Sequence, residues 1–209
     1  LPDDLKYMLL VESKCISAAY SKAKASGPWQ FIPSTGRRYR LKSDSVRDER
    51  RNLEMSTEAA VKYLKYLKDF QENDWFMAMA SYNAGEERVR KLLKEQNITD
   101  YWKMHGPRET MRYVPRIIAA KEIYSQPEKY LGLTKKDLYM PLETETITVN
   151  VKESQRALTS IAQEFGTYLL ELKMLNHEFK KDLLPHGTYQ IRVPRQTCPS
   201  RCFKQEKTP

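Results

Sequence analysis

A change in hydrophobic period near residue 130 limits the folds open to this chain more than any other feature. Upstream of it, apolar residues recur every three or four positions, as in the stretch from Ala59 to Leu67. Downstream, Thr144–Val151 and Thr188–Val193 alternate polar with apolar residues, and two short stretches between them have helical spacing. The first pattern indicates helices and the second indicates strands. The sequence therefore predicts a mainly α protein in four parts: a helical, bundle-like domain over residues 1–130, a linker over 131–143, a small strand–helix–helix–strand (βααβ) module over 144–194 and a flexible tail over 195–209.

Start and stop signals separate the helices that we expect in the first domain. Asp3 or Asp4 is expected to cap the first helix, and Ser56 is expected to open the second. The segment over residues 21–34 contains two prolines and Gly27, so it is expected to form a loop with a short helical stretch. Three further helices are predicted, from Trp75 to a stop at Gly85, over Glu86–Lys94 and over Arg108–Ser125.

Size and charge restrict the possible functions. With 209 residues and 40% hydrophobic content, the chain can bury one core of roughly 130 to 150 residues and a small module. The net charge of +9 favours an anionic partner such as nucleic acid, a membrane surface or an acidic wall polymer. Basic residues are scattered along helices, and known nucleic-acid-binding patterns are absent from the sequence, so we expect no nucleic-acid partner. An apolar run of about 18 residues is also absent, so no membrane span is predicted. Lacking an initiator Met and a signal-peptide pattern, the chain is expected to be a mature or truncated form.

Glu12 is the candidate catalytic residue. It follows Met8 and Leu9 by one helical turn and therefore lies on the inward-facing stripe, where a solvated carboxylate does not normally lie. An apolar setting disfavours the anion and raises the pKa of a carboxyl group, as an acid catalyst near neutral pH requires. The segments 27–31 and 81–85 contain turn, aromatic and amide residues that are able to fold over this carboxyl group. The pattern indicates an enzyme that cuts sugar chains.

Four segments carry a resemblance to a known family. They are Glu12-Ser13, Gly27-Pro28-Trp29-Gln30, Ser81-Tyr82-Asn83-Ala84-Gly85 and Glu109-Thr110-Met111-Arg112-Tyr113-Val114. Their order is that of the family, and Gln30 follows Glu12 by 18 positions, as in the family pattern. The first domain thus resembles the lytic transglycosylases of the soluble and membrane-bound type-D kind. The resemblance implies a lysozyme-like helical catalytic domain of the goose type.

The resemblance also implies an activity and a set of roles. The substrate would be peptidoglycan, cut at the bond between N-acetylmuramic acid and N-acetylglucosamine. Glu12 would act first as acid and then as base, leaving a 1,6-anhydro-muramyl end without the use of water. Substrate contacts are expected from six residues: Ser13, Trp29, Gln30, Tyr82, Asn83 and Tyr113. For the aromatic residues, plain core packing stays open as the alternative. We expect a monomer without cofactor that works in the periplasm or outside the cell, or that is anchored to the outer membrane.

The second unit is similar to a LysM-like module. The similarity lies in Ile161–Gly166, Leu172–Asn176, Pro185–Gly187 and Ile191–Pro194. It implies binding to chains that contain N-acetylglucosamine. The usual Gly-Asp-Thr turn after the first strand is replaced here by residues 152–154, Lys-Glu-Ser.

Departures from the family pattern leave alternative functions open. Cys15, Ser17 and Lys24 stand where the family has Phe, Pro and Gly. With these residues the cleft would suit a modified glycan, such as deacetylated peptidoglycan. The protein would alternatively be a lysozyme-type hydrolase. A wall-binding protein without turnover is the alternative of another class.

Cysteine and histidine suggest other chemistry, which we weigh against simpler roles. Cys15 with His105 or His177 would make a thiol nucleophile, but we expect Cys15 to be a small buried hydrophobic residue. The histidines lack ligand spacing, so no metal is predicted. For Cys198 and Cys202, a disulfide and two free thiols are equally expected. Finally, the glycosylation sequence Asn97–Thr99 is interpreted as a chance match.

Overall fold

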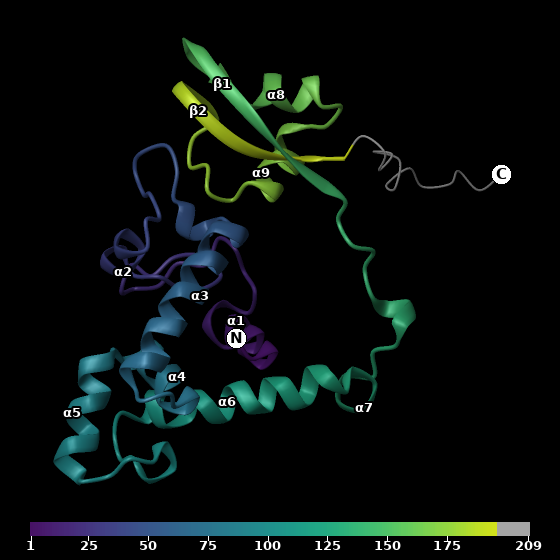
Figure 1. The fold of residues 1–209 in the computed structure, drawn as a ribbon. Coiled ribbons are helices and arrows are strands. Elements are labelled where there is room, and N and C mark those ends of the chain that lie inside the picture. The colour runs from purple at the N-terminus through teal and green to yellow at the C-terminus, as the bar shows by residue number, and fades with distance from the viewer. Residues whose placement is uncertain (196–209) are drawn as a thin grey trace.

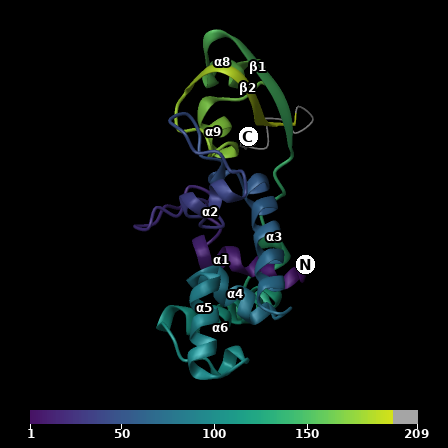
Figure 2. The same cartoon turned by 60° about the vertical axis from the view of Figure 1, so that its left-hand side comes forward.

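The computed structural model describes residues 1–195, and in it the chain forms two packed units, each with its own hydrophobic cluster. One cluster is built from residues between Leu5 and Ile117, and the other from residues between Val149 and Val193. The smaller unit sits above the N-terminal end of helix α3 (Leu53–Phe70), as two views of the ribbon show (Figures 1 and 2). The protein is mainly helical with one small antiparallel sheet, as the change of period predicted.

Helix α4 (Trp75–Ala84) is the centre of the first unit. Met77, Ala78, Met79, Ala80 and Ser81 are all buried, so the helix is covered on every side. It packs against α3, α5 and α6. The helices of this unit are η1 (Asp3–Tyr7), α1 (Met8–Ser13), α2 (Pro33–Arg38), η2 (Glu49–Arg51), α3, α4, α5 (Glu86–Gln96), η3 (Tyr101–Lys103) and α6 (Arg108–Ser125).

Two of the expected helix starts are wrong. Neither Asp3 nor Asp4 caps the first helix, which begins as the 3-10 turn η1 after Pro2. Both carboxylates form ion pairs instead, at 2.6 Å with Lys6 and at 2.5 Å with Lys121. Helix α3 begins at Leu53, upstream of the expected start at Ser56. The cause is Asn52, whose side-chain oxygen accepts a hydrogen bond from the backbone of Met55 at 3.0 Å and caps the helix.

Helix α6 has the predicted bounds although it contains Pro115. Proline lacks an N–H group, which leaves the carbonyl of Met111 without its usual helical partner. The hydroxyl of Tyr101 donates to this carbonyl and to that of Thr110, at 3.0 Å each. A side chain from η3 thus replaces the missing hydrogen bond, and the helix continues through the proline.

The second unit has the predicted order of strand, helix, helix and strand. Strands β1 (Thr144–Ala157) and β2 (Leu183–Pro194) pair antiparallel, with helices α8 (Leu158–Glu164) and α9 (Leu169–Leu175) between them in the chain. Both strands are longer than the alternating patterns, because a register shift between Val151 and Gln155 lets the pairing continue. Asn176 joins α9 to β2, since its amide binds the backbone of Arg192 in both directions at 2.7 Å.

The connection between the units is partly helical, with α7 (Pro127–Leu131) and η4 (Lys135–Asp137). The sequence predicted a plain linker over residues 131–143, without helices. The connection runs along the outside of the molecule, away from the surface on which the two units meet (Figure 1). The predicted flexible tail, together with Cys198 and Cys202, lies outside the described residues apart from residue 195.

Candidate active site

A cleft of about 680 Å³ crosses the first unit where α1, α4 and α6 approach one another. One side is formed by residues between 21 and 35, in the second half of the loop after α1 and at the start of α2. The other side is formed by the end of α4 and the first half of α6. Its lining includes five of the residues that the sequence singled out: Glu12, Gln30, Tyr82, Asn83 and Tyr113.

Glu12 reaches the cleft from the last turn of α1. The helix stops one residue later because Lys14 and Cys15 have left-handed backbone angles, with φ of 55° and 61°. The carboxylate accepts a hydrogen bond from the hydroxyl of Tyr113, a buried residue of α6. The two elements that hold this pair are about a hundred positions apart in the chain, so the tertiary fold creates the contact.

The protein raises the pKa of Glu12 from its ordinary value near 4.5 to about 7. Desolvation is the main cause, because protein atoms crowd the carboxyl group although part of the side chain still faces the cleft. The hydrogen bond from Tyr113 acts in the opposite direction and lowers the pKa, whereas the negative charge of Glu109 raises it. The balance leaves a substantial fraction of Glu12 protonated at neutral pH.

The cleft wall over residues 24–31 is held by hydrogen bonds to its backbone carbonyls. Ser13 donates from its hydroxyl to Pro28 at 2.8 Å, and Tyr82 donates to Trp29 at 2.7 Å. Gln30 folds back and donates to Gly27 at 2.7 Å, from a left-handed backbone with φ of 48°.

The side chains of Ser13 and Trp29 point away from the cleft surface. Both are buried, and neither lines the cleft. The indole N–H of Trp29 donates to the hydroxyl of Thr57 at 2.8 Å, and the Ser13 hydroxyl is bound to backbone carbonyls. Their polar groups are therefore already satisfied within the protein. Asn83 accepts a hydrogen bond from Thr110 at 3.1 Å, which ties the last turn of α4 to α6.

Helix α6 contributes two cleft residues that the sequence analysis did not assign. Glu109 and Arg116 line the cleft on either side of Tyr113. Spacings of four and three residues place all three on one face of the helix. This spacing was the available signal, because Tyr113 was already a candidate and its helical neighbours follow from it.

Comparison with known proteins identifies the part of this domain that precedes α6. Residues 2–105 match the family described as Transglycosylase SLT domain. The chain carries an SLT domain. It is 33% identical over 202 residues to the membrane-bound lytic murein transglycosylase D of Escherichia coli strain K12. The aligned region covers 94% of this chain and 44% of that protein. It is 26% identical over 184 residues to the peptidoglycan transglycosylase gp16 of Escherichia phage T7, covering 86% of this chain and 14% of the phage protein. The chain thus spans less than half the length of each relative.

These matches support the lytic transglycosylase class of enzyme, and the helical architecture is consistent with a lysozyme-like SLT domain. The family match ends at residue 105, so the likeness of residues 144–194 to a LysM-like module stays a prediction.

Cys15 is exposed, so the expectation that it is a small buried hydrophobic residue is wrong. The left-handed turn at the end of α1 directs it to the surface. Partial desolvation raises the pKa of its thiol, which favours the protonated form over the nucleophilic thiolate. This argues against a thiol mechanism for the SLT domain.

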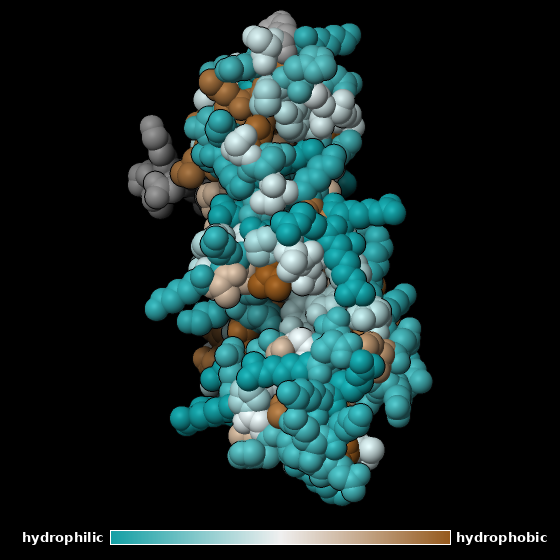
Figure 3. Space-filling model, turned by 90° about the vertical axis from the view of Figure 1, so that its left-hand side faces the viewer, coloured by the Kyte–Doolittle hydropathy of each residue, from teal (hydrophilic) through white to brown (hydrophobic). Residues whose placement is uncertain are grey.

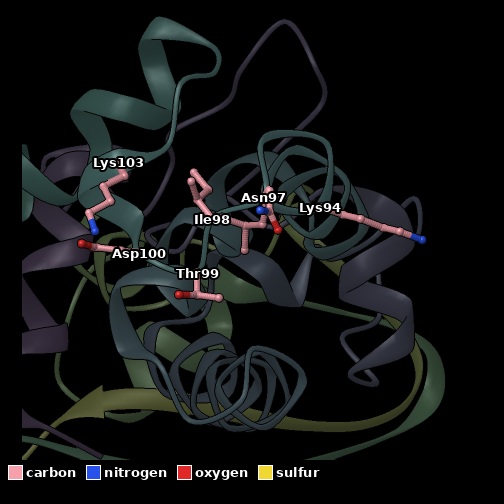
Figure 4. Close-up of a pocket in the computed structure, with 7 residues that line it drawn as sticks. Lys94, Asn97, Ile98, Thr99, Asp100 and Lys103 are labelled. Carbon is pink, nitrogen blue, oxygen red and sulfur yellow. The ribbon is translucent and has the colours of Figure 1, made fainter.

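Other surfaces of the described residues offer less chemistry than the SLT cleft. A shallow hollow of about 320 Å³ lies at the turn between α5 and η3, and the labelled side chains of Figure 4 surround it, with Lys94 pointing away from the others. It shares no lining residue with the cleft. The face seen in Figure 3 is mostly hydrophilic, with hydrophobic side chains scattered among charged ones.

Within residues 1–195, His, Cys, Asp and Glu side chains form no group of three able to hold a metal. No helix in this range is long and apolar enough to cross a membrane.

Proposed function

We propose that this protein cleaves peptidoglycan by transglycosylation, with Glu12 as the acid and base. The observation that carries the proposal is the desolvated carboxyl group of Glu12, which lies in the cleft of an SLT domain with a pKa of about 7. A general acid works best when its pKa lies near the operating pH. The names of the relatives, which refer to murein and peptidoglycan, support this substrate.

In the proposed reaction, the protonated Glu12 first donates its proton to the oxygen that bridges N-acetylmuramic acid and N-acetylglucosamine. The bond between this oxygen and the anomeric carbon of the muramyl residue breaks. The resulting carboxylate then removes the proton of the muramyl C6 hydroxyl, whose oxygen attacks the anomeric carbon. Glu12 regains its proton, and the product is a 1,6-anhydro-muramyl end. One carboxyl group performs both transfers, because the nucleophile belongs to the substrate.

The hydrogen bond from Tyr113 supports both transfers. It stabilises the carboxylate that forms after the first step and restrains the side chain in one orientation. The surrounding desolvation stabilises the acid that starts the cycle. These opposing effects bring the pKa of Glu12 close to neutral, where both forms are accessible.

We assign substrate contacts to the polar groups that face the cleft and supporting roles to those behind it. Gln30 and Asn83 line the cleft and are suited to sugar hydroxyl and acetamido groups, with Tyr82 and Tyr113 as neighbours. Ser13 and Trp29 hold the cleft wall in place. The net charge of +9 suits a polymer that bears muramyl-peptide carboxylates. Such a substrate implies a periplasmic or secreted protein.

Hydrolysis is a second candidate because Glu109 also lines the cleft. Inverting glycosidases use a second carboxylate as the base that activates water. If Glu109 had this role, Glu109→Gln would abolish cleavage. If Glu12 acts alone, we expect Glu109→Gln to remain active, with the pKa of Glu12 lowered because a nearby negative charge is lost. The pH at which kcat/KM declines on the alkaline side reports this change.

Mass spectrometry of the products from purified sacculi tests the proposal. We expect 1,6-anhydro ends from the wild type and no products from Glu12→Gln. Reducing ends would indicate hydrolysis, and cut peptides would overturn the glycosidic assignment. Binding to sacculi without any release would indicate a wall-binding protein instead. Acetylated and deacetylated sacculi, compared side by side, determine which glycan is preferred.

A further inference from the structure

The segment over residues 42–52 lies between the two units and contacts both. It folds as a tight hairpin in which Ser43 pairs with Asp48, and it continues through η2 into the start of α3. Its inner side faces the cleft wall, and its outer side faces the connection between α9 and β2 in the C-terminal unit. We call residues 42–52 the bridging segment.

Arg50 is the inner contact of the bridging segment. Its guanidinium donates to the backbone carbonyls of Lys24 and Phe31, at 2.8 Å each. These two carbonyls are the first and last of the cleft wall. The same guanidinium forms a two-pronged ion pair with Asp48, at 2.9 and 2.8 Å, and both side chains are almost fully buried. All of these bonds are charge-assisted, and the planar fork of arginine fixes their directions.

The backbone of Arg50 also restricts the cleft wall. Gly27 has φ of 85°, and a Cβ atom built on it would lie 1.7 Å from the carbonyl oxygen of Arg50. At Gly27 the wall therefore packs directly on the backbone of the bridging segment. Gln30 and Phe31, at the far end of the wall, line the cleft that contains Glu12. A displacement of Arg50 would consequently move cleft-lining residues.

The outer contacts join the bridging segment to the C-terminal unit. The backbone N–H of Asp48 donates to the carbonyl of Glu178 at 2.8 Å, next to the pairing of Arg47 with Phe179. The buried carboxylate of Glu178 accepts a hydrogen bond from the Asn52 amide at 2.7 Å. Val46, at the tip of the hairpin, packs against the hydrophobic cluster of the C-terminal unit.

A buried ion pair is a poor source of stability, because the desolvation of two charges offsets most of their attraction. The pair of Asp48 and Arg50 is therefore better explained by the geometry that it imposes. Displacements of about 1 Å in a catalytic site are able to cost about a hundredfold in rate. Hydrogen bonds at both ends of the cleft wall are the kind of restraint that prevents such displacements.

We propose that Arg50 is a positioning residue for the cleft wall and that the C-terminal unit supports it from outside through the bridging segment. The inference rests on the proposed function, since it concerns catalysis in the same cleft. It assigns the C-terminal unit a role in turnover that does not depend on glycan binding by that unit. The support acts on short and long glycans alike.

The first test replaces Arg50 by Lys in the full chain. Lysine keeps the charge beside Asp48 but lacks the planar fork that reaches both carbonyls and the carboxylate. We expect kcat on a short soluble glycan to fall at least about tenfold. We also expect faster amide hydrogen exchange over residues 24–31. A lowered melting temperature with unchanged kcat and unchanged exchange in the wall would reduce Arg50 to a purely structural residue and overturn the proposal.

The second test separates support from glycan binding. Val46→Asp places a charge in the contact with the C-terminal unit and leaves the cleft residues intact, and Val46→Ala is a milder variant if the first fails to fold. The control is Leu142→Asp, which changes an exposed residue of the linker. We expect kcat on the short glycan to fall about threefold or more for a Val46 variant and to stay unchanged for the control. An effect confined to the KM for sacculi, with kcat on short glycan intact, would overturn the proposal in favour of glycan binding.

Hydrogen exchange keeps the two hypotheses distinguishable. If the wild type releases no glycan product, the proposed function fails, but exchange in the cleft wall still tests the support. Faster exchange over residues 24–31 in both Arg50→Lys and Val46→Asp would sustain it. Unchanged exchange in both variants would overturn it, whatever the activity of the wild type.

Discussion

Replacing Glu12 by Gln should stabilise the folded protein at neutral pH while it removes activity. The pKa of Glu12 is about 7 in the folded protein and near 4.5 in its ordinary setting. Each unit of pKa corresponds to about 1.4 kcal/mol, so ionising this group in the folded state costs up to about 3.5 kcal/mol. The partial contact of the side chain with solvent makes this figure an upper bound. Glutamine fills the same space, keeps an acceptor for Tyr113 and cannot ionise.

The sign of the pH dependence follows from which state holds the proton. Between about pH 4.5 and 7 the unfolded chain has released the Glu12 proton, whereas the folded protein retains it. The free energy of unfolding therefore falls as the pH rises through this window, and the full loss is present above about pH 7. In Glu12→Gln this contribution is absent. The two proteins should differ in stability by about 2 to 3 kcal/mol above pH 7 and converge below about pH 4.5.

Urea unfolding across this pH range measures the difference directly. Glu58→Gln is the matched control, because it makes the same chemical change at an exposed glutamate of α3 that does not line the cleft. A stability difference for Glu12→Gln that does not vary with pH would refute the reasoning. A variant that is less stable than the wild type above pH 7 would refute it as well, since the carboxylate would then be stabilising.

Three further predictions concern the same cleft. In the wild type, kcat/KM should decline above about pH 7 as Glu12 loses its proton, and a pH–rate profile measures this limb. Tyr113→Phe removes a hydrogen bond that lowers the pKa of Glu12, so the limb should move to higher pH by about one unit, and an unmoved limb would contradict the assigned contact. Gly27→Ala should destabilise the fold by more than about 3 kcal/mol in urea, because the new methyl group would collide with the carbonyl of Arg50. Gly132→Ala is its control, since that glycine also has positive φ but open space around it, and about 1 kcal/mol is expected.

The arrangement of elements was predictable because it depends on local signals. The bounds of α6 and the stop of α4 at Gly85 followed from periodicity and turn residues, and the strand–helix–helix–strand order followed from the change of period. Helix starts were less predictable. Asn52 competes with Ser56 as a cap, and the sequence does not decide between two capping residues four positions apart. Cys15 was misjudged because its exposure depends on a left-handed turn that no glycine marks.

Within the site, the motifs predicted which residues gather but not which way they point. Glu12, Gln30, Tyr82 and Tyr113 all line the cleft, as their shared motif order suggested. Trp29 belongs to the same motif as Gln30, yet its indole N–H points away from the cleft and donates to Thr57 on α3. Orientation is set by partners elsewhere in the chain, and a sequence motif contains no information about them.

The cleft combines a destabilising group with four hydrogen bonds from side chains to the backbone of its wall. A carboxyl group with a pKa of about 7 lowers the stability of the fold at neutral pH. The wall opposite it has carbonyls at Lys24, Pro28, Trp29 and Phe31 that each accept a hydrogen bond from a side chain of another segment. Each such bond contributes on the order of 1 kcal/mol, and more where the donor is charged. The same bonds that offset the cost of Glu12 also fix the wall, so stability and catalytic geometry depend on the same contacts. A variant that loosens the wall should therefore lose turnover before it loses its fold.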